Sequence, residues 1–136
     1  MNLILLILLI LPLNSFAEDY DYKIIRVIDG DTIVIEAPYL PKPLKKEISL
    51  RIVNTDTPEL HKYKCELEYN LASEAKEFTQ NLIKKAKEKS VLIQGEDKYF
   101  RLLGDVVIDG KLLSNLLLEN GYAKPYKGSK KQSWCD

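Results

Sequence analysis

The chain has 136 residues, enough for one domain with its own core and too few for two. Apolar residues make up 46% and charged residues 29%, and 20 Lys and Arg balance 20 Asp and Glu. This balance excludes a protein-wide field that would attract polyanions or acidic membranes, so any such surface is expected to be a local patch.

The first 17 residues carry no charge and include the apolar run Leu3–Leu13, interrupted by Pro12. This run is too short for a membrane span, which needs about 20 residues. Ser15 and Ala17 stand at the positions that a signal peptidase reads. We therefore predict a cleaved secretory signal over 1–17, although the usual basic residues before the run are missing. A buried N-terminal strand and an uncleaved anchor are the alternatives.

Cys65 and Cys135 are the two cysteines of the chain. In an exported protein two cysteines are expected to pair. Without a surrounding cluster of His or Cys, two thiols make a poor zinc site. The sequence therefore predicts a disulfide that closes 70 residues of chain.

The first two predicted strands are 22–28 and 32–36, and they flank the turn Asp29-Gly30-Asp31. A D-G turn between β-branched segments indicates a β-hairpin. Asp31 is not needed for the turn itself, which makes it a candidate functional residue. Residues 37–45 contain three prolines and are predicted to be a loop.

A third predicted strand, 47–53, carries Arg51 and leads into Asp56-Thr57-Pro58-Glu59. Pro58 lacks a backbone donor and ends the pairing. The segment thus places an arginine on a strand and two carboxylates on the turn after it, where functional groups are commonly displayed. A salt-bridged strand end is the alternative interpretation.

From Tyr69 to Ala86 apolar residues recur every three or four positions, which predicts an amphipathic helix. Two further strands are predicted at 90–94 and 100–108, separated by a turn at 95–97, with a bend at Gly104. A short leucine-rich helix over 111–120 is expected to end at Gly121. The order predicts an α+β, mainly β fold: a five-stranded OB-fold barrel, with one helix between strands 3 and 4 and a short helix after strand 5.

Such a barrel would bring Asp31 near Asp56 and Glu59, and these carboxylates repel each other unless a cation lies among them. Hard oxygen ligands favour calcium or magnesium over zinc or copper, and carbonyls such as that of Thr57 favour calcium. Two arginines, Arg51 and Arg101, suit a phosphate. Together these groups are typical of phosphoryl transfer.

Three motifs, Val27–Thr32, Arg51–Glu59 and Asp97–Arg101, resemble in order those of the staphylococcal-nuclease-like (thermonuclease) family. The resemblance implies an OB-fold domain over 18–136 that uses calcium to cleave DNA and RNA and leaves 3′-phosphate ends. We expect a secreted or periplasmic monomer with no stable membrane association after signal cleavage.

The resemblance also implies roles for single residues. Asp31 and Asp56 would hold calcium through their side chains and Thr57 through its carbonyl. Glu59 would act as general base, and Arg51 and Arg101 would bind the phosphate and stabilise its transition state. The nucleotide pocket would be lined by Lys98, Tyr99 and Tyr126.

Two departures from the family pattern stand out. Phe100 occupies a position where the best-known member has glycine, just before Arg101. The chain also stops soon after Tyr126, and we hypothesise that the Cys65–Cys135 bridge ties down this shortened tail. The alternative functions are an OB-fold nucleic-acid-binding module without catalysis and an envelope domain with no nucleic-acid role.

Overall fold

The structure is a computed structural model that describes residues 22–136. The predicted signal over 1–17 lies outside the described residues. Across 22–136, none of the helices combines the length and the apolar character that crossing a membrane requires.

The described chain contains five strands of five or more residues, three strands of two residues and two helices. The strands are β1 (Ile24–Asp29), β2 (Thr32–Glu36), β3 (Glu47–Ile52), β4 (Thr55–Asp56), β5 (Lys89–Glu96), β6 (Leu102–Ile108), β7 (Lys111–Leu112) and β8 (Lys124–Pro125). The helices are α1 (Glu66–Lys85) and α2 (Leu113–Glu119).

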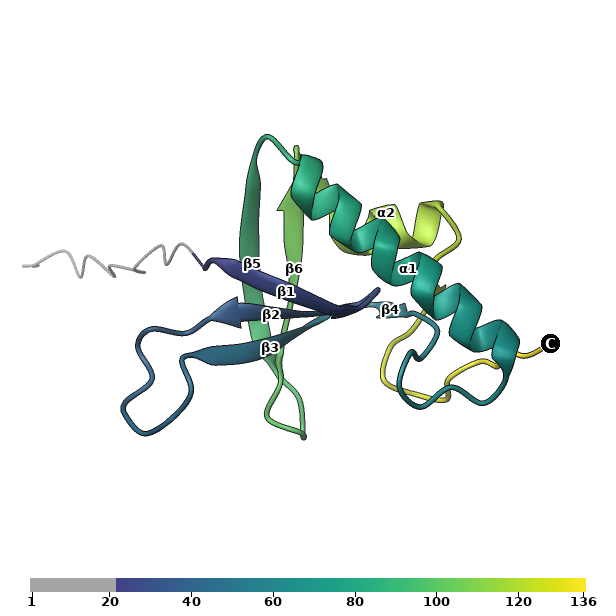
Figure 1. The fold of residues 1–136 in the computed structure, drawn as a ribbon, viewed down its shortest axis with the longest axis horizontal. Helices are drawn as coiled ribbons and strands as arrows, with labels where there is room; N and C mark the ends of the chain where they lie inside the picture. Colours follow the sequence, from purple (N-terminus) through teal and green to yellow (C-terminus); the bar gives the residue numbers. More distant parts are fainter. Residues whose placement is uncertain (1–21) are drawn as a thin grey trace, which may run out of the picture.

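The five long strands form one sheet in the order β1-β2-β3-β6-β5, and β7 adds to β6. The β1–β2 and β2–β3 pairs are antiparallel, whereas β3 and β6 run parallel. The strand pairings follow an open path from β1 to β5. The predicted order of three strands, a helix, two strands and a helix is confirmed, and the fold is an OB-like α+β fold that is mainly β (Figure 1).

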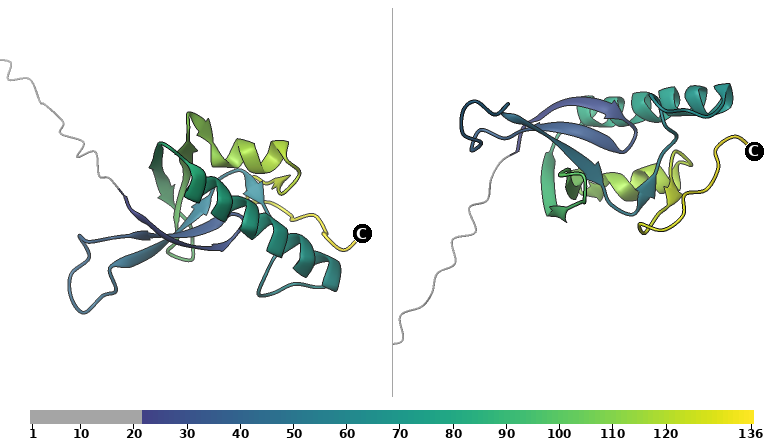
Figure 2. Two further views of the ribbon diagram at one scale, coloured as in Figure 1. Left: turned by 45° about the horizontal axis from the view of Figure 1, so that its top comes forward. Right: turned by 90° about the horizontal axis from the view of Figure 1, so that it is seen from below.

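The core lies between the curved sheet and the two helices, which lie side by side (Figure 2). Alternation along the strands points Ile33, Ile35 and Leu50 inward, and α2 contributes Leu113 and Leu117; all five are fully buried. Burying each of these side chains contributes about 1.5–3 kcal/mol. The helices and the sheet therefore depend on each other for stability.

Gly104 lies where β3, β5 and β6 meet, because it pairs with both Ile52 and Ile93. A Cβ at this position would collide with the backbone carbonyl of Leu92. The predicted bend position is thus a place of close backbone approach that only glycine permits.

Three element boundaries differ from the prediction. Helix α1 begins at Glu66, because the Cys65 sulfur accepts a hydrogen bond from the Glu68 amide and caps the first turn. Strand β5 continues through Glu96, so the turn falls at 97–101 and Arg101 precedes β6 instead of lying on it. Residues 111–112 form β7, and the last helix starts only at Leu113.

Phe100 lies in that displaced turn with a φ of +60°, in the left-handed region that glycine prefers. Its side chain is 85% exposed. The position thus keeps the backbone conformation suited to glycine although it carries a large aromatic side chain.

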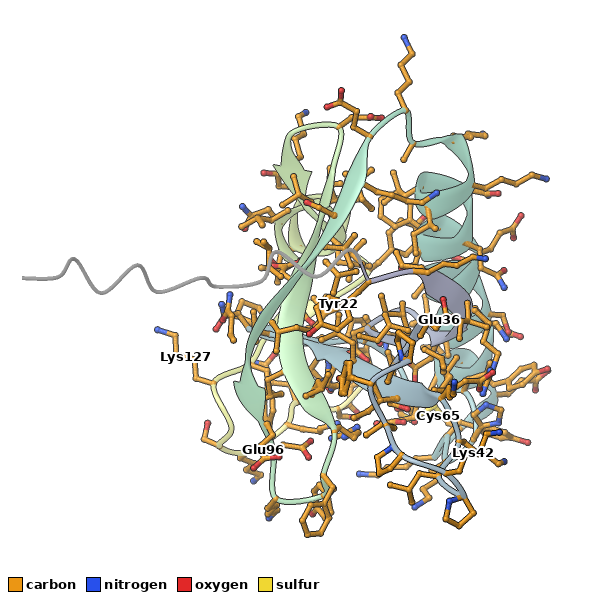
Figure 3. The ribbon with its side chains drawn as sticks, turned by 90° about the vertical axis from the view of Figure 1, so that its left-hand side faces the viewer. Tyr22, Glu36, Lys42, Cys65, Glu96 and Lys127 are labelled. Atoms are coloured by element: carbon orange, nitrogen blue, oxygen red, sulfur yellow. A yellow bond between two sulfur atoms is a disulfide. The ribbon has the colours of Figure 1, made fainter. Side chains whose placement is uncertain are left out.

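The C-terminal tail returns to the start of α1 (Figure 1). Strand β8 pairs with β4, which places Lys124 opposite Asp56. Farther along, the predicted cysteine pair is joined, with the Cys65 and Cys135 sulfur atoms 2.14 Å apart. Cys65 lies just before α1 (Figure 3), so one residue both caps the helix and anchors the tail.

We predict that the double variant Cys65→Ser/Cys135→Ser loses about 4 kcal/mol of unfolding free energy, the loop-closure contribution of a bridge of this span. Serine keeps the capping acceptor, so the change isolates the bridge. Urea denaturation should give the variant the same midpoint with and without reductant, whereas the wild type should weaken to the variant's value on reduction. Equal stability of variant and oxidised wild type would contradict this.

Candidate active site

The site is built around the Asp31 carboxylate, which links the first hairpin to the end of the third strand. Its Oδ2 accepts a hydrogen bond from the Thr57 amide at 2.9 Å and lies 2.5 Å from Arg51 Nη1. The residue is only 4% exposed. Burial raises the pKa of Asp31 well above its usual range, and the Arg51 guanidinium only partly offsets this effect. The group is therefore poised to gain from any further positive charge beside it.

Arg51 is buried on β3 and uses its donors mainly on the backbone. Its Nη2 donates to the Thr55 carbonyl at 2.8 Å and its Nη1 to the Ile52 carbonyl at 3.1 Å. The Asp56 carboxylate lies 4.0 Å from Nη2. Arg51 thus holds the strand end in shape and sets a fixed positive charge between Asp31 and Asp56.

Helix α1 fixes the hairpin turn from the other side. The Thr79 hydroxyl donates to the Gly30 carbonyl at 2.7 Å. A Cβ on Gly30 would lie 2.9 Å from both Ala75 Cβ and Thr57 Cγ2. Glycine at this position lets the helix, the turn and the Thr57 side chain pack directly against each other.

Asp56 and Thr57 carry two buried oxygens without a hydrogen bond, namely Asp56 Oδ1 and Thr57 Oγ1. Asp56 is only 3% exposed. A buried polar atom without a hydrogen bond costs free energy, so such atoms in a native fold call for an explanation, such as a cation beside them.

Two residues of the tail, Lys131 and Trp134, complete the site. The Lys131 ammonium lies 3.0 Å from Asp56 Oδ1, without the alignment of a hydrogen bond, and donates to Glu59 Oε1 at 3.2 Å. Trp134 Nε1 donates to Asp56 Oδ2 at 3.4 Å. Burial works to lower the pKa of Lys131, but the two carboxylates outweigh it and the pKa is raised. Sequence reasoning missed both contacts.

Glu59 stands at the rim, with 43% of its side chain exposed. Its amide donates to the buried Glu68 carboxylate, which also accepts from the Lys64 amide. Glu68 thereby shapes the loop that follows Glu59. The Oε2 of Glu59 has no hydrogen bond within the described chain, so it can accept one from a bound molecule.

Most of the predicted site residues surround one cavity of 770 Å³, which we call the nucleotide cavity. Its lining includes Asp31, Arg51, Glu59, Lys98, Tyr99, Arg101 and Tyr126. Two predicted residues, Asp56 and Thr57, instead line an adjoining cavity that shares Glu59 and Lys131 with it. Lys127 also lines the nucleotide cavity. It lies on the C-terminal loop, and its side chain extends away from the body of the molecule (Figure 3).

Arg101 is held at the mouth of this cavity by Asp97. Its Nε donates to Asp97 Oδ2 at 2.8 Å, and the guanidinium lies 5.7 Å from the Tyr99 ring centre. Burial works to raise the pKa of Asp97, but bonds from the Arg101 and Tyr99 amides and from the Arg101 side chain lower it overall. The terminal nitrogens of Arg101 have no hydrogen bond in the described part of the chain, so they are available to an anion.

The predicted cluster of three carboxylates does not form. Among residues 22–136, no three side chains of His, Cys, Asp or Glu converge as metal ligands. Arg51 lies between Asp31 and Asp56, and Lys131 lies between Asp56 and Glu59. What remains is a pair of carboxylates, Asp31 and Asp56, each within 4.0 Å of the Arg51 guanidinium. These hard oxygens, together with the unbonded Asp56 Oδ1, fit calcium or magnesium and not zinc.

Comparison with known proteins identifies relatives along most of the chain. The family described as "Staphylococcal nuclease homologue" matches residues 49–134. The chain is 32% identical over 111 residues to the thermonuclease of Staphylococcus hyicus, covering 81% of this chain and 62% of that protein. It is 32% identical over 123 residues to endonuclease YhcR of Bacillus subtilis, covering 85% of this chain and 10% of that protein.

A third relative is the uncharacterized protein MJ1439 of Methanocaldococcus jannaschii. It is 31% identical over 144 residues, covering 83% of this chain and 64% of that protein. The chain therefore spans less than two thirds of each of these three relatives.

We predict that Gly30→Ala lowers the free energy of unfolding by about 1–3 kcal/mol, because the added methyl group overpacks the junction of α1, the turn and Thr57. Gly95→Ala is the matched control, since a Cβ there has nothing within 4 Å. Chemical denaturation of both variants measures the difference. A loss in Gly30→Ala no larger than in Gly95→Ala would refute the packing argument.

We further predict that Lys131→Met tightens the binding of a divalent or trivalent cation about 5-fold, since an ammonium and a metal ion compete for Asp56 Oδ1 and an ion pair of this kind is worth roughly 1 kcal/mol. Terbium is a suitable probe, because Trp134, the single tryptophan, bonds to Asp56 and can sensitise its emission. Lys127→Met, with the same charge change in the nucleotide cavity, is the control. Equal affinities in the two variants would argue against competition at Asp56.

Proposed function

The chain belongs to the staphylococcal nuclease family, and from this premise we propose that it is a calcium-dependent nuclease that hydrolyses DNA and RNA and leaves 3′-phosphate ends. The observation that carries the proposal is the gathering of Asp31, Arg51, Glu59 and Arg101 around one cavity. A domain that only binds nucleic acid has no need for a carboxylate such as Glu59 among the cationic groups of this cavity. The names of two relatives, a thermonuclease and an endonuclease, point the same way.

Calcium would be held by the side chains of Asp31 and Asp56 and by the carbonyl of Thr57. When bound, it would polarise a phosphoryl oxygen and help to neutralise the charge of the transition state. The raised pKa of Asp31 supports this assignment, because a cation would stabilise its buried carboxylate. Asp56 Oδ1 also supports it, because this buried atom has an ion pair with Lys131 but no hydrogen bond.

Glu59 would act as general base on the attacking water. It is the exposed carboxylate of the site, and its Oε2 is open to accept a proton. The Glu68 carboxylate fixes the Glu59 backbone, which holds the base at the rim without blocking it.

The two arginines would have different parts in binding the phosphate. Arg101 is over a third exposed, and its terminal nitrogens can form paired bonds to phosphate oxygens while Asp97 fixes its Nε. Arg51 is tied to backbone carbonyls, so it would contribute mainly a preorganised positive charge beside the reacting group.

Lys98, Tyr99 and Tyr126 would contact the nucleotide. Tyr99 is largely exposed and lies 5.2 Å from the Lys98 ammonium, so its ring is available to a base beside a cation that can meet a phosphate. The tail loop carries Tyr126, whose ring lies 5.7 Å from the Lys131 ammonium. This contact links the nucleotide cavity to the carboxylates.

The domain proposed to act is 18–136, exported by a signal over 1–17 to the periplasm or the medium. The Cys65–Cys135 bridge supports an oxidising compartment, because disulfides persist there and are rare in the cytosol. We propose that the domain works as a monomer without stable membrane association.

The hydrolysis of single-stranded DNA tests the proposal. We predict cleavage by residues 18–136 in calcium, none in chelator, and a fall of about 10²–10⁴-fold in Glu59→Gln, because a positioned general base contributes this much. Thermal unfolding of the variant controls for a damaged fold. Binding of DNA in calcium without cleavage by the wild type would instead identify a binding module that lacks catalysis.

A further inference from the structure

A second cavity, of 710 Å³, lies between the tail and the loop after Glu59, and we call it the tail cleft. One wall is the loop with Lys62 and Lys64, and the other is the tail from Lys130 to Trp134. The tail cleft shares Glu59 and Lys131 with the nucleotide cavity. The two cavities therefore meet at the carboxylate proposed as general base.

The charges of the tail cleft suit an anion. Lys62, Lys64 and Lys130 are exposed, and none of them forms an ion pair within residues 22–136. Its three carboxylates each have contacts within the protein: Glu68 accepts two backbone amides, Asp56 contacts Lys131 and Trp134, and Glu59 contacts Lys131 through Oε1. Three lysines without an ion pair therefore line the tail cleft, and with Lys131 its four lysines outnumber its three carboxylates.

A hydrogen bond, a cation–π contact and a disulfide hold the tail wall in place. The Lys124 ammonium donates to the Ser133 carbonyl at 2.6 Å and lies 4.4 Å from the Trp134 ring centre. The Cys65–Cys135 bridge then fixes the residue after Trp134 to the start of α1. The cleft is thus preformed, which lowers the entropic cost of binding.

We propose that the tail cleft is a second strand-binding subsite, which takes the phosphates of a nucleic-acid chain on the side of Glu59 opposite the nucleotide cavity. The proposal rests on the proposed function, because it assigns to the tail cleft the continuation of that substrate. A chain lying in both cavities extends past the reacting phosphate in both directions, so the enzyme cuts within a strand. The continuity of the cavities at Glu59 favours nucleic acid over an acidic peptide.

Binding of oligothymidylate in chelator, followed by fluorescence anisotropy at several salt concentrations, tests the subsite. The variant carries Lys62→Ala, Lys64→Ala and Lys130→Ala. Its control carries Lys84→Ala, Lys85→Ala and Lys87→Ala, three exposed lysines around the end of α1 with the same total charge change. The ligands are a dinucleotide and a chain of about 12 nucleotides, within the site size of an OB fold.

We predict that the slope of log K against log salt for the longer chain becomes shallower by about 2 in the tail-cleft variant, since each lost phosphate contact removes roughly 0.7. The control should keep the wild-type slope. The dinucleotide should bind wild type and variant equally, because it fits within the nucleotide cavity.

The subsite would be overturned by equal slopes in the two triple variants, or by an equal loss of dinucleotide binding. Competition with polyglutamate is a further test. If polyglutamate displaces the oligonucleotide as effectively as unlabelled DNA of the same charge does, the tail cleft is a general polyanion-binding surface and the proposal is overturned. If the wild type cleaves DNA but the two triple variants have equal slopes, the subsite is refuted and the proposed nuclease function is retained. If the wild type does not cleave DNA but the tail-cleft variant shows the predicted change of slope, the nuclease function is refuted and the subsite is supported.

Discussion

The buried Asp31 carboxylate is the constraint on which the rest of the site depends. It joins a hairpin turn, the amide of Thr57 and the guanidinium of Arg51 in one place. Each partner belongs to a different segment, and α1 presses on the same turn through Gly30. The junction also sets the positions of Asp56 and Glu59, because Asp56 directly precedes Thr57 and Glu59 follows it by two residues.

Positively charged side chains of the protein separate the carboxylates of the site. Arg51 separates the first two carboxylates, and Lys131 separates the second from the third. Both cations belong to the chain itself, so the acidic residues coexist without an added ion. A divalent cation would therefore enter a site that is already neutralised in part, and it would have to compete with the lysine of the tail more than with the arginine, which the backbone holds in place.

Much of the fold was predictable because its signals are local. The D-G turn, the alternation along 32–36 and 47–53, and the helical period after Tyr69 each depend on neighbours in sequence, and the strand and helix order followed from them. The resemblance supplied the roles of single residues and added Lys98, Tyr99 and Tyr126. The short strands β4 and β8 were missed, since two residues carry no pattern. Lys131 and Trp134 were missed because their positions depend on where a distant disulfide fixes the tail, which no local pattern encodes.

The parallel pairing of β3 with β6 affects how the protein folds. It joins residues as distant in the chain as Leu50 and Leu102. The chain loses conformational entropy on closing a loop of this length, and this loss comes before the stabilising contacts form. Arg101, which directly precedes β6, therefore joins Asp31, Arg51 and Glu59 only after this pairing forms. The proposed active site is therefore complete only when this long-range pairing has formed.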